Sequence, residues 1–358
     1  MSGITTKFTQ LLGLRTPIVS GVMAGASGGA LAAEVTRAGG FGFIAFGYGS
    51  IEKFRSEVAL ARSILKVQPQ LPLPIGIGYL GWQLELPNAP AEECLSAALD
   101  ENVQAIWLSF GKRLHQWIKY IRDHERSAGA TKVFVQVTSV EEALVAVNDW
   151  KVDVVIAQGT EAGGHGSSSG STLLTLIPEI LAVLPKDGPP VLAAGGIANG
   201  AQIASLLTLG ASGVVLGTRF LLSPESLYSN TQRQAIITAR TASSVRTMAF
   251  DHARNTLGWP EGIDGRALRN STVEDFEKGV DIDIMRRKFV EGVKNDDPDR
   301  ILVWAGAGVG LMNRIQPAKE IVEELDQECS RSLRDAALLL GTVSIHTNHK
   351  IYHPRSKI

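Results

Sequence analysis

The sequence predicts an α/β fold, a (β/α)8 TIM barrel with an additional, mainly helical C-terminal region that covers the barrel mouth. Eight short apolar runs begin between residues 17 and 213, so their seven intervals average about 28 residues, the length of one strand, one helix and two loops. The runs are continuously apolar, as parallel strands buried on both faces require. After residue 219 the repeat stops.

The predicted strands span residues 17–23, 41–46, 73–78, 105–110, 132–137, 154–158, 190–194 and 213–217. Between them, apolar residues recur at three- and four-residue intervals and predict helices at 30–38, 51–65, 92–100, 114–124, 140–148, 173–184 and 201–209. No break in strand order is visible, which favours a closed barrel over residues 1–219. An open doubly wound sheet has the same periodicity and stays open as the alternative.

Residues 220–358 form the predicted helical, substrate-covering region. Between residues 317 and 340 an apolar residue occurs at every fourth position, which predicts one long amphipathic helix that packs back on the barrel. This stripe consists of Ile321, Leu325, Cys329, Leu333 and Ala337. The turn-rich segment 258–265 is predicted to be an ordered loop.

Composition excludes several classes of partner. The 35 basic and 36 acidic residues nearly cancel and form no long single-sign runs, so neither nucleic acid nor a membrane surface is an expected partner. No apolar run approaches the ~18 residues of a membrane span. Cys94 and Cys329 lie far apart and outside any C-x-x-C spacing, so we expect neither a disulfide framework nor a metal site.

These features predict a protein of a reducing compartment, cytoplasmic, and working as a monomer or homodimer. The chain ends in Ser356, Lys357 and Ile358, one conservative change from the S-K-L peroxisomal address. A peroxisomal location is therefore the alternative.

Glycines gather where the predicted strands end. Gly195 and Gly196 follow the seventh strand and Gly217 follows the eighth, where this fold commonly binds phosphate. Backbone without Cβ atoms lets N–H groups approach a ligand closely. The alternative interpretation of each cluster is that its glycines only allow tight turns between strand and helix. The glycines of 306–310 do not form a dinucleotide fingerprint, because the third glycine position is Leu311, and we expect a loop closing on the barrel mouth.

The loop after the sixth strand, residues 158–166, carries one histidine, His165, among four glycines. A histidine accepts and returns protons near neutral pH, since its ordinary pKa is ~6.5. His165 is thus the candidate catalytic residue on the catalytic rim of the barrel. A solvated loop histidine is the alternative interpretation.

Taken together, these motifs resemble the nitronate monooxygenases, formerly called 2-nitropropane dioxygenases, which are FMN-dependent barrels. The resemblance covers nearly the whole chain. It is carried by residues 17–25, 31–40, 158–166, 193–197, 217–220 and 304–311. Flavin-dependent enoyl reductases and NAD(P)H:quinone reductases share much of this pattern, and segment 258–270 favours the fungal nitronate monooxygenases.

The resemblance implies a set of FMN-binding positions. Val22, Met23 and Ala24 would run beneath the flavin ring, and Gly163 and Gly164 would flank it. The phosphate would be held by the chain after strands seven and eight, at Ala194, Gly195, Gly196, Gly217 and Thr218. Two further positions differ from the family pattern: Gln136 stands at the pyrimidine side where lysine is frequent, and Gly78 stands where asparagine is usual.

The implied reaction oxidises an alkyl nitronate, or a nitroalkane deprotonated by His165, with O2 to a carbonyl compound and nitrite. Tyr79, Trp82 and Phe220 are rim candidates by position and could equally be packing residues. The alternative enzyme is an FMN-dependent NAD(P)H:quinone or enoyl reductase. A non-catalytic flavin-binding protein is the alternative of another class, and it has no need of a proton acceptor such as His165.

Overall fold

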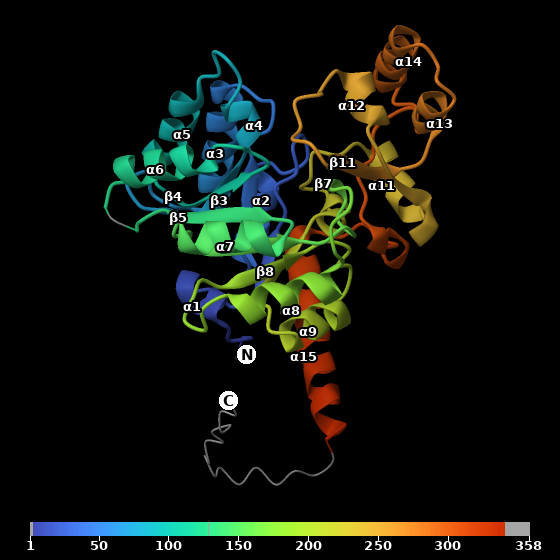
Figure 1. The fold of residues 1–358 in the computed structure, drawn as a ribbon. Helices are drawn as coiled ribbons and strands as arrows, with labels where there is room; N and C mark the ends of the chain where they lie inside the picture. The colour runs from blue at the N-terminus through green and yellow to red at the C-terminus, as the bar shows by residue number, and fades with distance from the viewer. Residues whose placement is uncertain (1–2, 128, 341–358) are drawn as a thin grey trace, which may run out of the picture.

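The computed structural model describes residues 3–127 and 129–340 of the chain (Figure 1). All eight predicted barrel strands are present, within a few residues of their predicted ends. They are β1 (Ile18–Ser20), β2 (Phe43–Ala45), β3 (Leu73–Leu80), β4 (Val103–Ser109), β5 (Lys132–Val137), β6 (Val154–Gln158), β8 (Val191–Ala194) and β9 (Gly213–Leu216).

The eight strands form one parallel sheet that closes on itself. Their order is β1-β9-β8-β6-β5-β4-β3-β2. The two ends of this order meet through a parallel bridge between Val19 and Phe41. The prediction of a (β/α)8 barrel is therefore confirmed, and the open doubly wound alternative is wrong.

Aromatic side chains fill the barrel interior. Phe43 contacts Phe41, Trp107 and Phe134 edge-on, with ring centroids 5.2, 5.2 and 5.4 Å apart. Phe8, from helix α1 (Lys7–Leu12), packs edge-on against Phe134 from one end of the barrel. That end is where the strands begin, because Phe8 also lies beside Gly213, the first residue of β9. With the N-terminal end closed, any ligand must enter at the opposite rim.

Helices surround the barrel as the apolar periodicity predicts. They are α2 (Gly29–Arg37), α3 (Ile51–Leu65), α5 (Ala91–Asp100), α6 (Leu114–His124), α7 (Val140–Asn148), α8 (Leu173–Val183) and α9 (Gly200–Thr208). Short helices α4 (Gly81–Leu84) and α10 (Thr218–Leu221) follow β3 and β9.

The long C-terminal helix α15 (Ala318–Leu338) packs between α9 and α2, as its apolar stripe predicts (Figure 1). A Cβ at Gly200 would lie 2.3 Å from the backbone nitrogen of Cys329, so the absence of a side chain allows α9 and α15 to approach closely. Arg15 adds an ion pair of 3.0 Å with Asp326.

Two segments that the sequence predicts as loops contain strands. Part of 158–166 becomes β7 (Gly164–Ser167), and part of 258–265 becomes β11 (Ile263–Leu268). Together with β10 (Ser244–Thr247) they form a second, antiparallel sheet of order β10-β11-β7. β7 is glycine-rich and pairs with β11 across about 100 residues of chain, so this pairing leaves no local periodicity to read.

Beyond this sheet the C-terminal part is helical. It contains α11 (Asn230–Thr238), α12 (Ala249–Arg254), α13 (Ser271–Glu277) and α14 (Ile282–Lys294), with 3-10 turns at Thr241–Ser243 and Ala307–Leu311. Figure 1 shows these helices gathered beside the barrel, next to β7 and β11. Within the described residues we find no helix long and apolar enough to cross a bilayer. Ser356, Lys357 and Ile358 lie outside the described residues.

The barrel interior allows a first test. Phe134 is fully buried and contacts three aromatic rings, so Phe134→Ala should lower the free energy of unfolding by about 3–5 kcal/mol through lost burial and the cavity left behind. Chemical denaturation measures the change. Leu174→Ala on α8 is the control, because the Leu174 side chain is 71% exposed and should change stability by less than about 0.5 kcal/mol. Equal effects of the two variants would contradict the described interior.

Candidate active site

A cavity lies at the rim where the barrel strands end. It contains about 1240 Å³ of space not filled by atoms, part of it open to solvent. The structure brings together on its wall every residue that the sequence assigns to the flavin or to catalysis. These are Val22, Met23, Ala24, Gly78, Gln136, Gly163, Gly164, His165, Ala194, Gly195, Gly196, Gly217 and Thr218.

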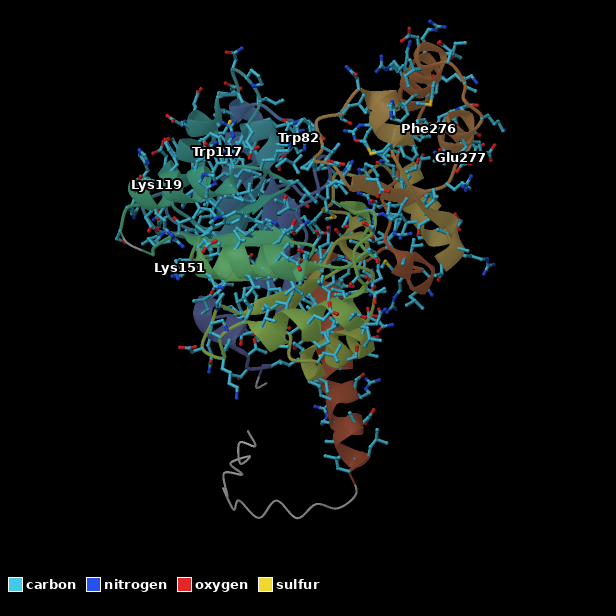
Figure 2. All side chains as sticks on the ribbon, viewed as in Figure 1. Trp82, Trp117, Lys119, Lys151, Phe276 and Glu277 are labelled. Atoms are coloured by element: carbon cyan, nitrogen blue, oxygen red, sulfur yellow. The ribbon has the colours of Figure 1, made fainter. Side chains whose placement is uncertain are left out.

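The three aromatic rim candidates do not line this cavity. Tyr79 is buried, and its hydroxyl donates to the carbonyl of Cys94 at 2.7 Å. Phe220 is fully buried within the core. Trp82 packs behind the wall against Trp259, with centroids 5.3 Å apart, and Figure 2 shows it where the barrel faces the C-terminal part. The packing interpretation is therefore correct for all three.

His165 lies on β7, opposite Gly265 of β11. Its Nε2 atom is 2.9 Å and 3.0 Å from the two carboxylate oxygens of Asp251, a residue of α12 with no exposed surface. The same carboxylate accepts hydrogen bonds from the Thr256 hydroxyl at 2.8 Å and from the Trp259 indole nitrogen at 3.0 Å. A buried carboxylate with three donors is well satisfied.

Two tryptophans fix the orientation of the imidazole. Trp259 stacks on the His165 ring with centroids 3.5 Å apart and an interplanar angle of 11°. Trp304 meets the same ring edge-on at 4.9 Å. A Cβ at Gly265 would lie 2.4 Å from the Trp304 ring, so only glycine lets β11 pass between Trp304 and the histidine strand. The ring thus has contacts on its face and its edge.

The loop that carries His165 is tied to the neighbouring sheet. Arg246 on β10 donates to the carbonyl of Gly166 at 2.7 Å, and Arg266 on β11 donates to the carbonyl of Thr160 at 3.1 Å. Gln158 donates from Nε2 to the His165 carbonyl at 3.0 Å. The glycine-rich segment is therefore an ordered element and not a solvated loop.

Burial lowers the pKa of His165 below its ordinary value, and the hydrogen bond and charge of Asp251 oppose this shift. The imidazole side chain is only 8% exposed, and a pKa below the ordinary ~6.5 favours its neutral form at pH 7. A carboxylate accepts hydrogen bonds and donates none, so the neutral ring carries its proton on Nε2. Its Nδ1 atom then has the free lone pair that a general base requires.

Asp251, Trp259 and Trp304 were missed by sequence reasoning. Asp251 follows Phe250 on a short helix whose apolar residues are buried, and no motif marks it. The one sequence feature that points to Asp251 is weak: it is a charged residue among the apolar residues Ala249, Phe250 and Ala253. Within the residues that the structure describes, no group of three or more His, Cys, Asp or Glu could hold a metal.

The barrel part of the wall has unsatisfied polar groups that FMN could use. Gln136 Nε2 and Gln158 Oε1 are buried without a hydrogen-bond partner in the described structure. The backbone N–H groups of Gly196 and Gly217, beyond the ends of β8 and β9, likewise have no acceptor among the described residues. Amide donors and acceptors suit a flavin ring, and glycine N–H groups suit a phosphate, so the residues present fit FMN.

The fold and this rim define a (β/α)8-barrel enzyme with a cavity at the C-terminal ends of the strands and His165 on the cavity wall. Within that class the chain belongs to the nitronate monooxygenase family of oxidoreductases, whose family model matches residues 82–328. A nitronate monooxygenase of Metarhizium robertsii is 34% identical over 326 residues, covering 86% of this chain and 89% of the relative.

Solved structures of two proteins are similar to this chain over most of its length. Nitroalkane oxidase from Streptomyces ansochromogenes is similar with a TM-score of 0.75 and 28% identity, covering 93% of this chain and 100% of that chain. FabK from Thermotoga maritima is similar with a TM-score of 0.74 and 28% identity, covering 93% and 99%.

The His165–Asp251 pair predicts a measurable titration. By NMR, His165 should titrate below the ordinary ~6.5, because burial disfavours the imidazolium. Asp251→Asn should lower the pKa further, since it removes the charge that raises it. Both Thr256 and Trp259 donate to Oδ1, so the asparagine amide should face Nε2 and move the ring proton to Nδ1. An unshifted pKa with the same tautomer in both proteins would contradict the pairing.

Proposed function

We propose that the protein is an FMN-dependent nitronate monooxygenase that oxidises alkyl nitronates and nitroalkanes with O2 to a carbonyl compound and nitrite. The observation that carries this proposal is the buried pairing of His165, which lines the cavity, with Asp251 behind it, in a cavity whose wall also offers unpaired amide and glycine N–H groups. Membership of the nitronate monooxygenase family supports it.

The proposed FMN site uses two parts of the wall. Val22, Met23 and Ala24 would lie beneath the ring and Gly163 and Gly164 beside it. The polar edge of the ring would meet Gln136 and Gln158, and the phosphate would meet the chain at Ala194, Gly195, Gly196, Gly217 and Thr218. Bound there, FMN would supply the electron-transfer chemistry between the nitronate and O2, which the side chains of the site do not offer.

The protein supplies proton transfer and orientation. In the proposal, His165 Nδ1 removes the proton from the α-carbon of a neutral nitroalkane. Asp251 then stabilises the imidazolium through Nε2 and keeps the reactive nitrogen turned away from itself. A nitronate arrives without that proton, so it needs only binding and orientation.

We also propose that residues 220–358 cover the substrate, as a region distinct from the barrel of residues 1–219. The supporting observation is that side chains of this region line the same cavity as the glycines of the barrel. These side chains are Leu221, Tyr228, Arg254, Trp259, Trp304 and Met312. Indole and phenol rings there would exclude water from the reacting carbon.

Location and assembly are further proposals: a monomer or homodimer in the cytoplasm, with the peroxisome as the alternative. The cytoplasmic location rests on Cys94 and Cys329, which are both free and buried, as expected in a reducing compartment. The alternative rests on Ser356, Lys357 and Ile358, and fusing these residues to a reporter tests it.

Anaerobic mixing separates the proposed reaction from the reductase alternative. The flavin of the holoprotein should be bleached by an alkyl nitronate and not by NAD(P)H. Bleaching by NAD(P)H alone would identify a reductase instead.

Gly217→Asp tests the phosphate position. Gly217 has φ −99°, and a Cβ there would meet only the Met23 sulfur at 3.5 Å, so a side chain fits without strain. Its carboxylate would repel the phosphate, and FMN affinity measured by flavin fluorescence should fall at least about tenfold more than in Gly217→Asn, the uncharged control of equal size. Gly195 is a poorer choice, because its φ of +134° would strain any side chain. Equal affinities of the two variants would place the phosphate elsewhere.

His165→Asn tests the base. Loss of a positioned base costs about 10²–10⁴ in rate, so turnover of neutral nitroalkanes should fall by that factor. Preformed nitronates should keep most of their activity, and bound flavin should be unchanged. Steady-state rates on 1-nitropropane and its nitronate give the comparison. If both substrates lose activity equally with flavin still bound, His165 orients the substrate and is not the base.

A further inference from the structure

Arg254, the last residue of α12, presents a cation to the active-site cavity. The side chain is half-buried, and its guanidinium carbon lies 5.5 Å from the centroid of the Tyr48 ring. Among the described residues, none pairs with this guanidinium or accepts a hydrogen bond from it. Other partly buried arginines are paired: Arg300 with Asp275 at 2.5 Å, and Arg122 with Asp153 at 2.5 Å.

The rest of the described cavity wall does not compensate this charge. No aspartate or glutamate lines the cavity. Asp251, three residues earlier on the same helix, is turned away and already accepts from His165, Thr256 and Trp259. Arg254 is therefore the one permanent charge on the described wall. A partly desolvated cation attracts an anion from the cavity more strongly than it would in water.

We propose that Arg254 binds the planar two-oxygen anion of the substrate, an inference that rests on the proposed function. A guanidinium presents two parallel N–H groups, and these match an O–X–O group bidentately. Both a nitronate and a carboxylate have that shape and charge. The anion held is thus either the reacting nitronate itself or a carboxylate elsewhere on a nitro acid.

The position relative to His165 fits this role. Arg254 and His165 line the same cavity, and Trp259, stacked on His165, lines it too. Burial is the main cause of the lowered pKa of His165, and the charge of Arg254 acts in the same direction. One cation therefore favours both a neutral base and an anionic substrate beside it.

The test compares Arg254→Gln and Arg254→Lys with a matched control, Arg287→Gln, an exposed arginine of α14. The substrates are 1-nitropropane, its nitronate, and the nitronate of 3-nitropropanoate, which adds a carboxylate. A hydrogen-bonded charge pair is worth about 10- to 100-fold in binding. Arg254→Gln should therefore raise KM for anionic substrates by that factor and leave KM for neutral 1-nitropropane within about twofold. Arg254→Lys should recover part of the loss, and the control should change nothing.

The two anion sources give different patterns. A similar loss for both nitronates means that Arg254 holds the nitronate group. A loss confined to the nitronate of 3-nitropropanoate means that it holds the remote carboxylate. The proposal is overturned if neutral and anionic substrates lose equally, if no substrate is affected, or if Arg254→Gln loses bound flavin or thermal stability, since Arg254 would then serve the cofactor or the fold.

A binding measurement separates this proposal from the proposed function. Nitrate is a planar oxyanion that does not react as a nitronate, and its calorimetric titration into the flavin-loaded protein should weaken at least about tenfold in Arg254→Gln. If the protein oxidises no nitronate yet binds nitrate in this Arg254-dependent way, the proposed function fails and the anion site stands. Nitrate binding that is equal in the wild type and Arg254→Gln overturns the anion site, whatever the enzyme oxidises.

Discussion

The antiparallel pairing of β7 with β11 is the interaction on which the active site depends. Its register sets His165 opposite Gly265 and so brings the loop after β6 against a segment 100 residues later. Arg246 and Arg266 strengthen this pairing from the neighbouring strands by donating to carbonyls of the histidine segment. Without these hydrogen bonds the glycine-rich chain would sample many conformations, because glycine restricts the backbone least. The second sheet thus turns a flexible segment into a fixed support for one imidazole.

A buried carboxylate is the costly element of this arrangement. Removing Asp251 from water is unfavourable, and the structure offsets the cost with three hydrogen-bond donors instead of a paired arginine. Trp259 contributes twice, since its indole nitrogen donates to Asp251 and its ring stacks on His165. Trp259 therefore contacts both the Asp251 carboxylate, which sets the tautomer of His165, and the His165 ring, whose orientation it fixes. The nearby cation Arg254 stays free of the pair and is left to act on the cavity.

The barrel could be predicted from sequence because its signals are local. Each strand is a continuous apolar run, and each helix has its own periodicity, so α3, α6 and α7 have the predicted bounds. The glycines after β8 and β9 and the loop of His165 follow from the strand ends, and the structure places all of them on one cavity wall. Asp251, Arg254 and the two tryptophans could not be predicted, because their positions depend on a sheet formed between distant segments. The prediction that Tyr79, Trp82 and Phe220 line the rim was wrong for a different reason. Their positions on β3, α4 and α10 place them near the strand ends, but their side chains are buried and pack away from the cavity.

The return of α15 to the barrel has a consequence for the order of events during synthesis. The last barrel strand, β9, ends at Leu216, yet the surface between α9 and α2 is covered by α15, which begins about 100 residues later. A nascent chain that has just completed its strands still exposes the apolar seam that Ile321, Leu325 and Cys329 later bury. It also lacks the carboxylate and indole rings that surround the histidine. During synthesis, the barrel strands are therefore complete before the active site can form. In the interval between these two steps, the unfinished chain exposes an apolar surface suited to aggregation or chaperone binding.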